Sequence, residues 1–125
     1  MPNSKNPVRI LVLDDEPIVR RGAMRLLLAR GYDVLEAATA AEALRLLEET
    51  EDPVHLLICD LLLEGLPGRE AAILLQARRP DMRVLYMSGS DEAEFRRQLE
   101  REEPVFLAKP FRSAQLYEAV ERALA

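Results

Sequence analysis

The chain alternates five times between a short apolar run and a longer segment whose apolar residues recur at helical spacing. Four of the runs are near-continuously apolar, which is typical of parallel strands covered on both faces. The remaining run, 33–37, alternates polar and apolar residues, so we expect it at an edge of the sheet. Short connections between the elements favour right-handed crossovers and a doubly wound parallel sheet. The expected strands are residues 8–13, 33–37, 55–59, 83–87 and 105–108.

The segments between and after these runs predict five helices. Gly31 is well placed as the C-cap of the first helix, and Thr39 with Glu42 forms a capping-box pattern at the start of the second. The third begins near Gly68, the highly charged fourth follows Asp91, and the fifth begins at Ser113. The residues expected to face the core are Val19, Ala23, Leu26 and Leu27; Ala40, Ala43, Leu44 and Leu47; Ala71, Leu74 and Leu75; Phe95 and Leu99; and Leu116, Val120, Ala123 and Leu124.

A chain of 125 residues fits one domain, which we place at residues 8–125 after a disordered lead at 1–7. The net charge of -5 argues against a nucleic-acid-binding surface, although it leaves room for a small basic patch. No apolar stretch approaches the ~20 residues of a membrane span. The single Cys59 excludes an internal disulfide and fits a reducing compartment, so the cytoplasm is the expected location.

Polar side chains follow four of the five apolar runs. Asp14 and Asp15 follow the first run, Asp60 the third, Ser88 the fourth and Lys109 the fifth. Parallel strands end at a common edge, which is where ligands bind in open α/β sheets. We therefore expect three carboxylates, a hydroxyl and an ammonium to meet there. Such a set can hold a divalent cation and place a phosphoryl group on an aspartate.

The carboxylates predict a magnesium site, because clustered carboxylates repel one another unless a cation offsets their charge. Mg²⁺ prefers oxygen ligands and keeps several waters. We expect Asp15 and Asp60 to bind it directly, Asp14 to act mainly through water, and the backbone carbonyl of Leu62 to be a further ligand. The alternative is that the Asp-Asp pair forms a solvated turn leading into the next helix.

The other side chains at this edge predict phosphoryl chemistry. Asp60 follows an apolar strand, where a carboxylate is poorly solvated, and aspartate can attack phosphorus to form an acyl phosphate. Ser88 can donate a hydrogen bond to a phosphoryl oxygen, and Lys109 can neutralise phosphoryl charge. Pro110 allows a cis peptide bond that aims the lysine at the carboxylates. The alternatives are a helix-capping aspartate, a plain turn serine and a surface lysine.

Taken in order, four segments resemble the receiver domains of bacterial two-component response regulators: LVLDDEP, LLICDLL, VLYMSGS and FLAKPF. The resemblance covers residues 8–124 and is greatest to the receivers of hybrid sensor kinases. It implies a flavodoxin-like α/β fold, with a five-stranded parallel sheet of order 2-1-3-4-5 and five helices. It also implies one role per position: Asp60 as phospho-acceptor, Asp14 and Asp15 as the acidic pair for Mg²⁺, Ser88 as switch hydroxyl, Lys109 as the phosphoryl contact and Phe106 as the aromatic switch.

The function that the resemblance implies is a phosphorylation-controlled signalling receiver. It accepts a phosphoryl group from a histidine kinase or histidine phosphotransfer protein, which we expect to dock around Pro17, Ile18 and Arg21. It then switches a protein-interaction surface towards a downstream target or an attached domain. The chain assists its own phosphorylation and dephosphorylation without being a classical enzyme, and is expected as a monomer or weak homodimer.

One position departs from the receiver pattern. Many receivers have proline four residues after the phospho-acceptor, whereas this chain has Glu64, with Pro67 three places later. We therefore expect a differently shaped loop after Asp60. The alternative function is a phosphorylation-independent binding module of the same fold. Its usual sign is loss of an acidic residue or of the lysine, and none is lost here.

Overall fold

The computed structural model describes residues 7–89 and 105–125 of the chain. Most of the predicted lead at 1–7 and the predicted fourth helix therefore lie outside the described residues. Among the described residues, no helix is both long enough and apolar enough to span a membrane.

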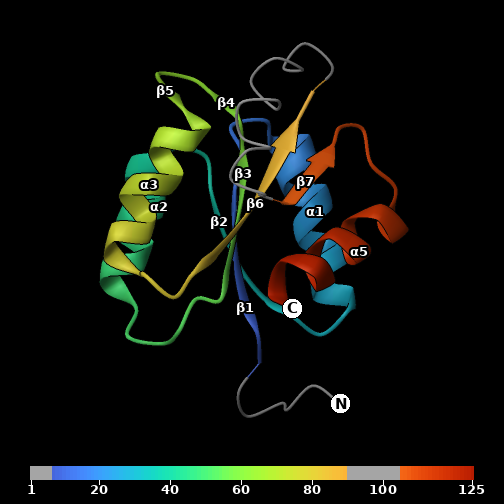
Figure 1. Ribbon diagram of the computed structural model, residues 1–125, viewed down its shortest axis with the longest axis horizontal. Coiled ribbons are helices and arrows are strands. Elements are labelled where there is room, and N and C mark those ends of the chain that lie inside the picture. The colour runs from blue at the N-terminus through green and yellow to red at the C-terminus, as the bar shows by residue number, and fades with distance from the viewer. Residues whose placement is uncertain (1–6, 90–104) are drawn as a thin grey trace.

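The centre of the molecule is a five-stranded parallel sheet, as predicted. Its strands lie in the order β2-β1-β3-β6-β7, so β2 occupies an edge, as the alternating pattern indicated. All five strands point the same way, and their carboxyl ends meet at the top of Figure 1. The strands are β1 (Arg9–Leu13), β2 (Asp33–Ala37), β3 (Leu56–Asp60), β6 (Arg83–Ser88) and β7 (Val105–Ala108).

The predicted strand order 2-1-3-4-5 needs a correction, because the chain has two further short strands. β4 (Leu62–Leu63) and β5 (Leu66–Pro67) follow β3 and pair antiparallel with each other, outside the main sheet. The prediction missed them because a two-residue strand carries no periodicity. They form a small hairpin in the segment that follows Asp60.

Four helices lie within the described residues, where five were predicted for the whole chain. α2 and α3 cover one face of the sheet, and α1 and α5 cover the other (Figure 1). The C-cap of α1 is Arg30, and Gly31 stands one residue beyond it with φ of 87°. The helices are α1 (Pro17–Ala29), α2 (Ala40–Glu49), α3 (Gly68–Arg78) and α5 (Ser113–Leu124).

Two apolar clusters, one on each face of the sheet, explain the continuous apolar strands. Along β1, Leu11 and Leu13 enter one cluster while Ile10 and Val12 enter the other. The cluster that contains Leu11 includes the buried side chains of α2 and α3, and the other includes those of α1 and α5. Both faces of each central strand are thus buried, so the strand sequences do not alternate between polar and apolar residues.

The expected buried face of α3 needs correction. Leu74 is 56% exposed, although it was expected in the core. The sheet-facing side of α3 is centred on Ala71, Ala72 and Leu75, and this leaves Leu74 turned outward. In α5, Leu124 is partly buried and packs against the core, as expected, and Ala119 is buried as well.

Candidate functional site

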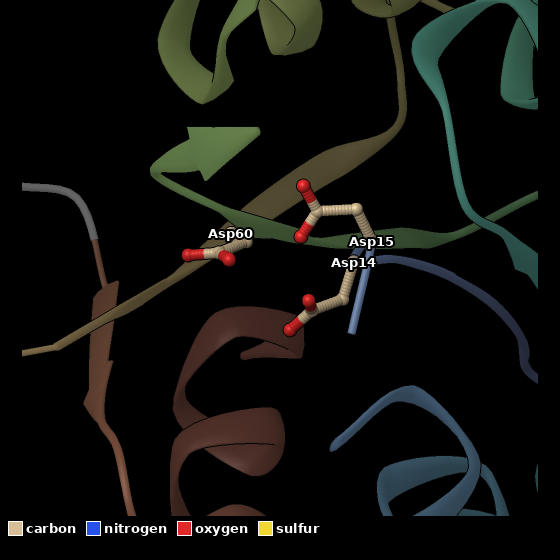
Figure 2. A group of neighbouring side chains, drawn as sticks. All are labelled: Asp14, Asp15 and Asp60. Atoms are coloured by element: carbon tan, nitrogen blue, oxygen red, sulfur yellow. The ribbon is translucent and has the colours of Figure 1, made fainter. Parts of the chain in front are cut away.

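Three aspartates meet at the carboxyl edge of the sheet (Figure 2). Asp14 and Asp15 follow β1, and Asp60 is the last residue of the neighbouring strand β3. One carboxylate oxygen from each lies within 4.8 Å of the others. β1 and β3 are adjacent although many residues separate them in sequence, and this adjacency brings the carboxylates together.

Asp14 is fixed at three of its polar groups. Its N–H donates to the carbonyl of Ala37 at 3.2 Å, and its Oδ1 accepts from the N–H of Glu16 at 2.9 Å. Its carbonyl oxygen accepts from Nη1 of Arg20 at 2.9 Å, while Nε of Arg20 pairs with Glu36 Oε1 at 2.9 Å. The guanidinium thus joins α1, β2 and the acidic pair.

Sequence reasoning missed Arg20. Its signal was weak, because an arginine one turn into a helix is ordinary. Only the fold shows that it is buried, at 9% exposure, and lies between Asp14 and Glu36.

Lys109 lies among the carboxylates. Its Nζ is 2.9 Å from Oδ2 of Asp14, 3.0 Å from Oδ2 of Asp60 and 3.3 Å from Oε1 of Glu16. The backbone N–H of Lys109 donates to the carbonyl of Ser88 at 2.8 Å, which fixes the end of β7 against β6. The Lys109–Pro110 peptide bond is cis, as the proline allows.

The shared environment shifts the pKa values of this lysine and its acidic partner. Burial raises the pKa of Asp60, and the charge of Asp14 adds to this, while the hydrogen bond from Lys109 acts in the opposite direction. Burial alone would lower the pKa of Lys109. The hydrogen bonds and charges of Asp14 and Asp60 outweigh burial and raise it. The ammonium therefore stays protonated and offsets part of the acidic charge.

Ser88 places a buried hydroxyl at the same edge. It is the last residue of β6 and is 1% exposed, and its Oγ has no hydrogen-bond partner among the described residues. The preceding residue, Met87, is the register partner of Asp60 on β3. A buried polar group without a partner is uncommon, and Ser88 can therefore serve an oxygen anion that enters the site.

The hairpin β4–β5 lies next to the site and donates two backbone N–H groups to its aspartates. The N–H of Leu62 donates to Oδ1 of Asp60 at 3.3 Å, and the Leu62 side chain is 59% exposed. At the turn, the N–H of Glu64 donates to Oδ2 of Asp15 at 3.0 Å. Gly65 has φ of 86°, which glycine adopts readily, so the chain can reverse within two residues.

Gly68 allows α3 to begin close to Asp60. A Cβ at this position would lie 1.9 Å from the carbonyl oxygen of Asp60 and 2.7 Å from Cα of Leu61. The N–H of Gly68 donates to the carbonyl of Leu61 at 2.8 Å. A glycine is needed here because backbone approaches backbone.

The residues present fit a magnesium ion. The donors are hard carboxylate oxygens from three residues, close enough together to share one cation, and Asp14 and Asp60 are almost fully buried. The buried Ser88 hydroxyl and the Lys109 ammonium complete a set suited to a phosphoryl group.

Phe106 lies on β7 and is half-buried. Its ring centroid is 6.1 Å from that of Tyr86 on β6, with an interplanar angle of 36°. Tyr86 is 8% exposed and belongs to the apolar cluster that contains Leu11.

Comparison with known proteins points to a receiver domain. The profile of the response regulator receiver domain matches residues 10–121. The chain is 35% identical over 116 residues to the sensor kinase CckA of Brucella abortus (strain 2308), covering 92% of this chain and 12% of that protein. It is 39% identical over 119 residues to the transcriptional activator protein ExaE of Pseudomonas putida, covering 93% of this chain and 55% of that protein.

Solved structures agree. The receiver domain of NtrX from Brucella abortus superimposes with a TM-score of 0.81 at 30% identity, covering 92% of this chain and 97% of that one. A response regulator receiver domain protein from Clostridium thermocellum gives a TM-score of 0.82 at 26% identity, with 94% of each chain covered. The fold is therefore the flavodoxin-like α/β fold of receivers.

The chain belongs to the response regulator receiver domain family. It covers only part of the length of the curated relatives named above, 12% of one and 55% of the other.

Proposed function

We propose that the chain is a signalling receiver that accepts a phosphoryl group on Asp60 with the help of Mg²⁺. The observation that carries the proposal is the position of Asp60. Its carboxylate is buried beside the acidic pair and within 3.0 Å of the Lys109 ammonium. Membership of the receiver family supports the same reaction.

In the proposed reaction, an Asp60 carboxylate oxygen supplies the electron pair that forms the new oxygen–phosphorus bond. The phosphorus–nitrogen bond of a phosphohistidine donor breaks, and the imidazole leaves with that electron pair. The reaction needs charge neutralisation and positioning more than a strong base. Lys109 and the Ser88 hydroxyl contact the phosphoryl oxygens. Asp15, Asp60 and the carbonyl of Leu62 would hold Mg²⁺, with Asp14 acting through water, and the ion would supply further charge neutralisation.

The same reaction gives a switch. A phosphoryl group on Asp60 offers its oxygens to the Ser88 hydroxyl, which has no partner among the described residues. A shift of Ser88 towards the group frees space for the Phe106 ring to move further inward. The charge added at Asp60 thereby changes the side-chain packing of the surface around β7 and α5.

The proposal is tested by incubating the purified chain with a small phosphodonor, with and without Mg²⁺, and measuring the intact mass. Addition of one phosphoryl group that requires Mg²⁺ supports it. A folded chain that binds Mg²⁺ and takes up no phosphoryl group would contradict it. That result would favour the alternative, a phosphorylation-independent binding module of the same fold.

The donor protein is proposed to dock on α1. Ile18 is 89% exposed next to the site, and an apolar groove of about 400 Å³ runs from it to Pro110 and Phe111. Ile18→Asp should slow transfer from a phosphorylated histidine phosphotransfer protein about tenfold or more, since a charge would enter an apolar contact. Uptake from a small phosphodonor should not change.

The matched control is Leu28→Asp, because Leu28 is also exposed on α1, at 51%, but lies near the far end of the helix. Transfer rates are measured by following the phosphorylated chain with time. Equal slowing by both variants, or none by either, would contradict docking around Ile18.

Leu62 is expected to control the lifetime of the phosphorylated chain. Leu62→Asn places an amide that can hydrogen-bond water where an apolar side chain now lies half-exposed. We expect hydrolysis to quicken roughly fivefold, the effect of about one hydrogen bond. Decay of the phosphorylated chain gives the rate, with Leu62→Met as the apolar control. Equal decay in the asparagine variant and the parent would refute this role.

A further inference from the structure

The β4–β5 hairpin is tied to the acidic pair by one hydrogen bond. The N–H of Glu64, at the turn, donates to Oδ2 of Asp15 at 3.0 Å across 49 positions of sequence. Proline at this position would have no N–H to donate. The glutamate that departs from the usual receiver pattern thus provides a contact that the usual residue could not make.

The three carboxylates differ in how they are held. Lys109 contacts Asp14 and Asp60, and each also accepts a backbone N–H, from Glu16 and Leu62 respectively. Asp15 is partly exposed. Within residues 7–89 and 105–125, its carboxylate accepts a hydrogen bond from Glu64 alone.

We propose that the Glu64 N–H is a positioning donor that orients the Asp15 carboxylate for a divalent cation and couples the hairpin to cation binding. Oδ2 is engaged by the amide, so Oδ1 is left to face the ion. Hydrogen bonds to ligating carboxylates commonly set metal affinity in this way. The inference rests on the proposed function, since it concerns the same magnesium site.

Coupling between two events is reciprocal. If the hydrogen bond from the Glu64 N–H favours cation binding, a bound cation must in turn favour the conformation in which that hydrogen bond is formed. The Glu64 amide should then exchange with solvent more slowly in the presence of Mg²⁺.

The variants Glu64→Pro and Glu64→Ala separate the N–H from the side chain. Both remove the same carboxylate and so change the local charge equally, but only proline removes the N–H. Gly65, with φ of 86°, suits the second central position of a type II turn, where proline is favoured at the first. A type II turn accepts proline at its first central position.

The experiment is a Mg²⁺ titration followed by two-dimensional NMR, for the parent and both variants. We expect Glu64→Pro to bind Mg²⁺ three- to tenfold more weakly than Glu64→Ala, a range set by the loss of one charge-assisted hydrogen bond near the surface. Amide exchange of the unmodified chain, with and without Mg²⁺, tests the same coupling without a substitution. It decides the matter if the proline variant does not fold.

Equal Mg²⁺ affinity in the proline and alanine variants would overturn the inference, as would Glu64 amide exchange that Mg²⁺ leaves unchanged. In either case a parent that binds Mg²⁺, and loses affinity with Asp15→Asn, would leave the proposed function standing. A parent without affinity for Mg²⁺ would overturn both.

Discussion

Gly68→Ala is expected to cost the fold several kcal/mol, a large fraction of the stability of a domain of this size. The added Cβ would lie 1.9 Å from the Asp60 carbonyl oxygen and 2.7 Å from Cα of Leu61. Both obstacles are backbone atoms, so no side chain can turn aside to relieve the overlap. Either α3 moves away or the end of β3 is displaced, and Asp60 moves with it.

Chemical denaturation followed by circular dichroism measures this loss, and Gly22→Ala is the matched control. Gly22 lies inside α1, and a Cβ there would meet nothing within 4 Å. Alanine in an open helix interior is favoured over glycine by about 1 kcal/mol, so this variant should be slightly more stable than the parent. Similar stabilities for the two variants would contradict the close backbone contact between Gly68 and the end of β3.

Asp60→Asn is expected to abolish phosphoryl uptake, a loss beyond about a hundredfold, without loss of stability. An amide oxygen is a poor nucleophile, so the acyl phosphate cannot form. The raised pKa of Asp60 means that the folded state disfavours its ionised form. The parent therefore loses stability relative to the amide variant as the pH rises from the ordinary aspartate value through the pKa of Asp60.

Intact mass measures the uptake, and thermal unfolding at several pH values measures the stability. Asp81→Asn is the control, because Asp81 is exposed and follows α3. It should keep both phosphoryl uptake and stability. Uptake retained by Asp60→Asn would place the acceptor elsewhere.

Much of the fold could be predicted because its signals repeat along the chain. Each central strand contains a run of four apolar residues, and each of these strands contributes to two buried clusters. The edge position of β2 followed from its alternation. Leu74 was misplaced because the sheet-facing side of α3 is built partly from alanines, which give a weak apolar signal next to two leucines.

The candidate site likewise contains residues that could be placed from the sequence and contacts that only the structure shows. The placement of Asp14, Asp15, Asp60, Ser88 and Lys109 at one edge of the sheet could be predicted, because each lies at the end of a recognisable strand and parallel strands end at a common edge. Arg20 and the Glu64 amide were missed. One acts on a backbone carbonyl and the other through a backbone N–H, so neither role is visible in the residue type.

Chemical mapping of the modified residue shows which aspartate carries the phosphoryl group. The chain is phosphorylated with a small donor and Mg²⁺, and borohydride then reduces the acyl phosphate to a homoserine side chain. Peptide mass spectrometry locates that residue. Homoserine at position 60 alone is the expected result, whereas homoserine at position 14 or 15, or at no position in a phosphorylated sample, would contradict the account.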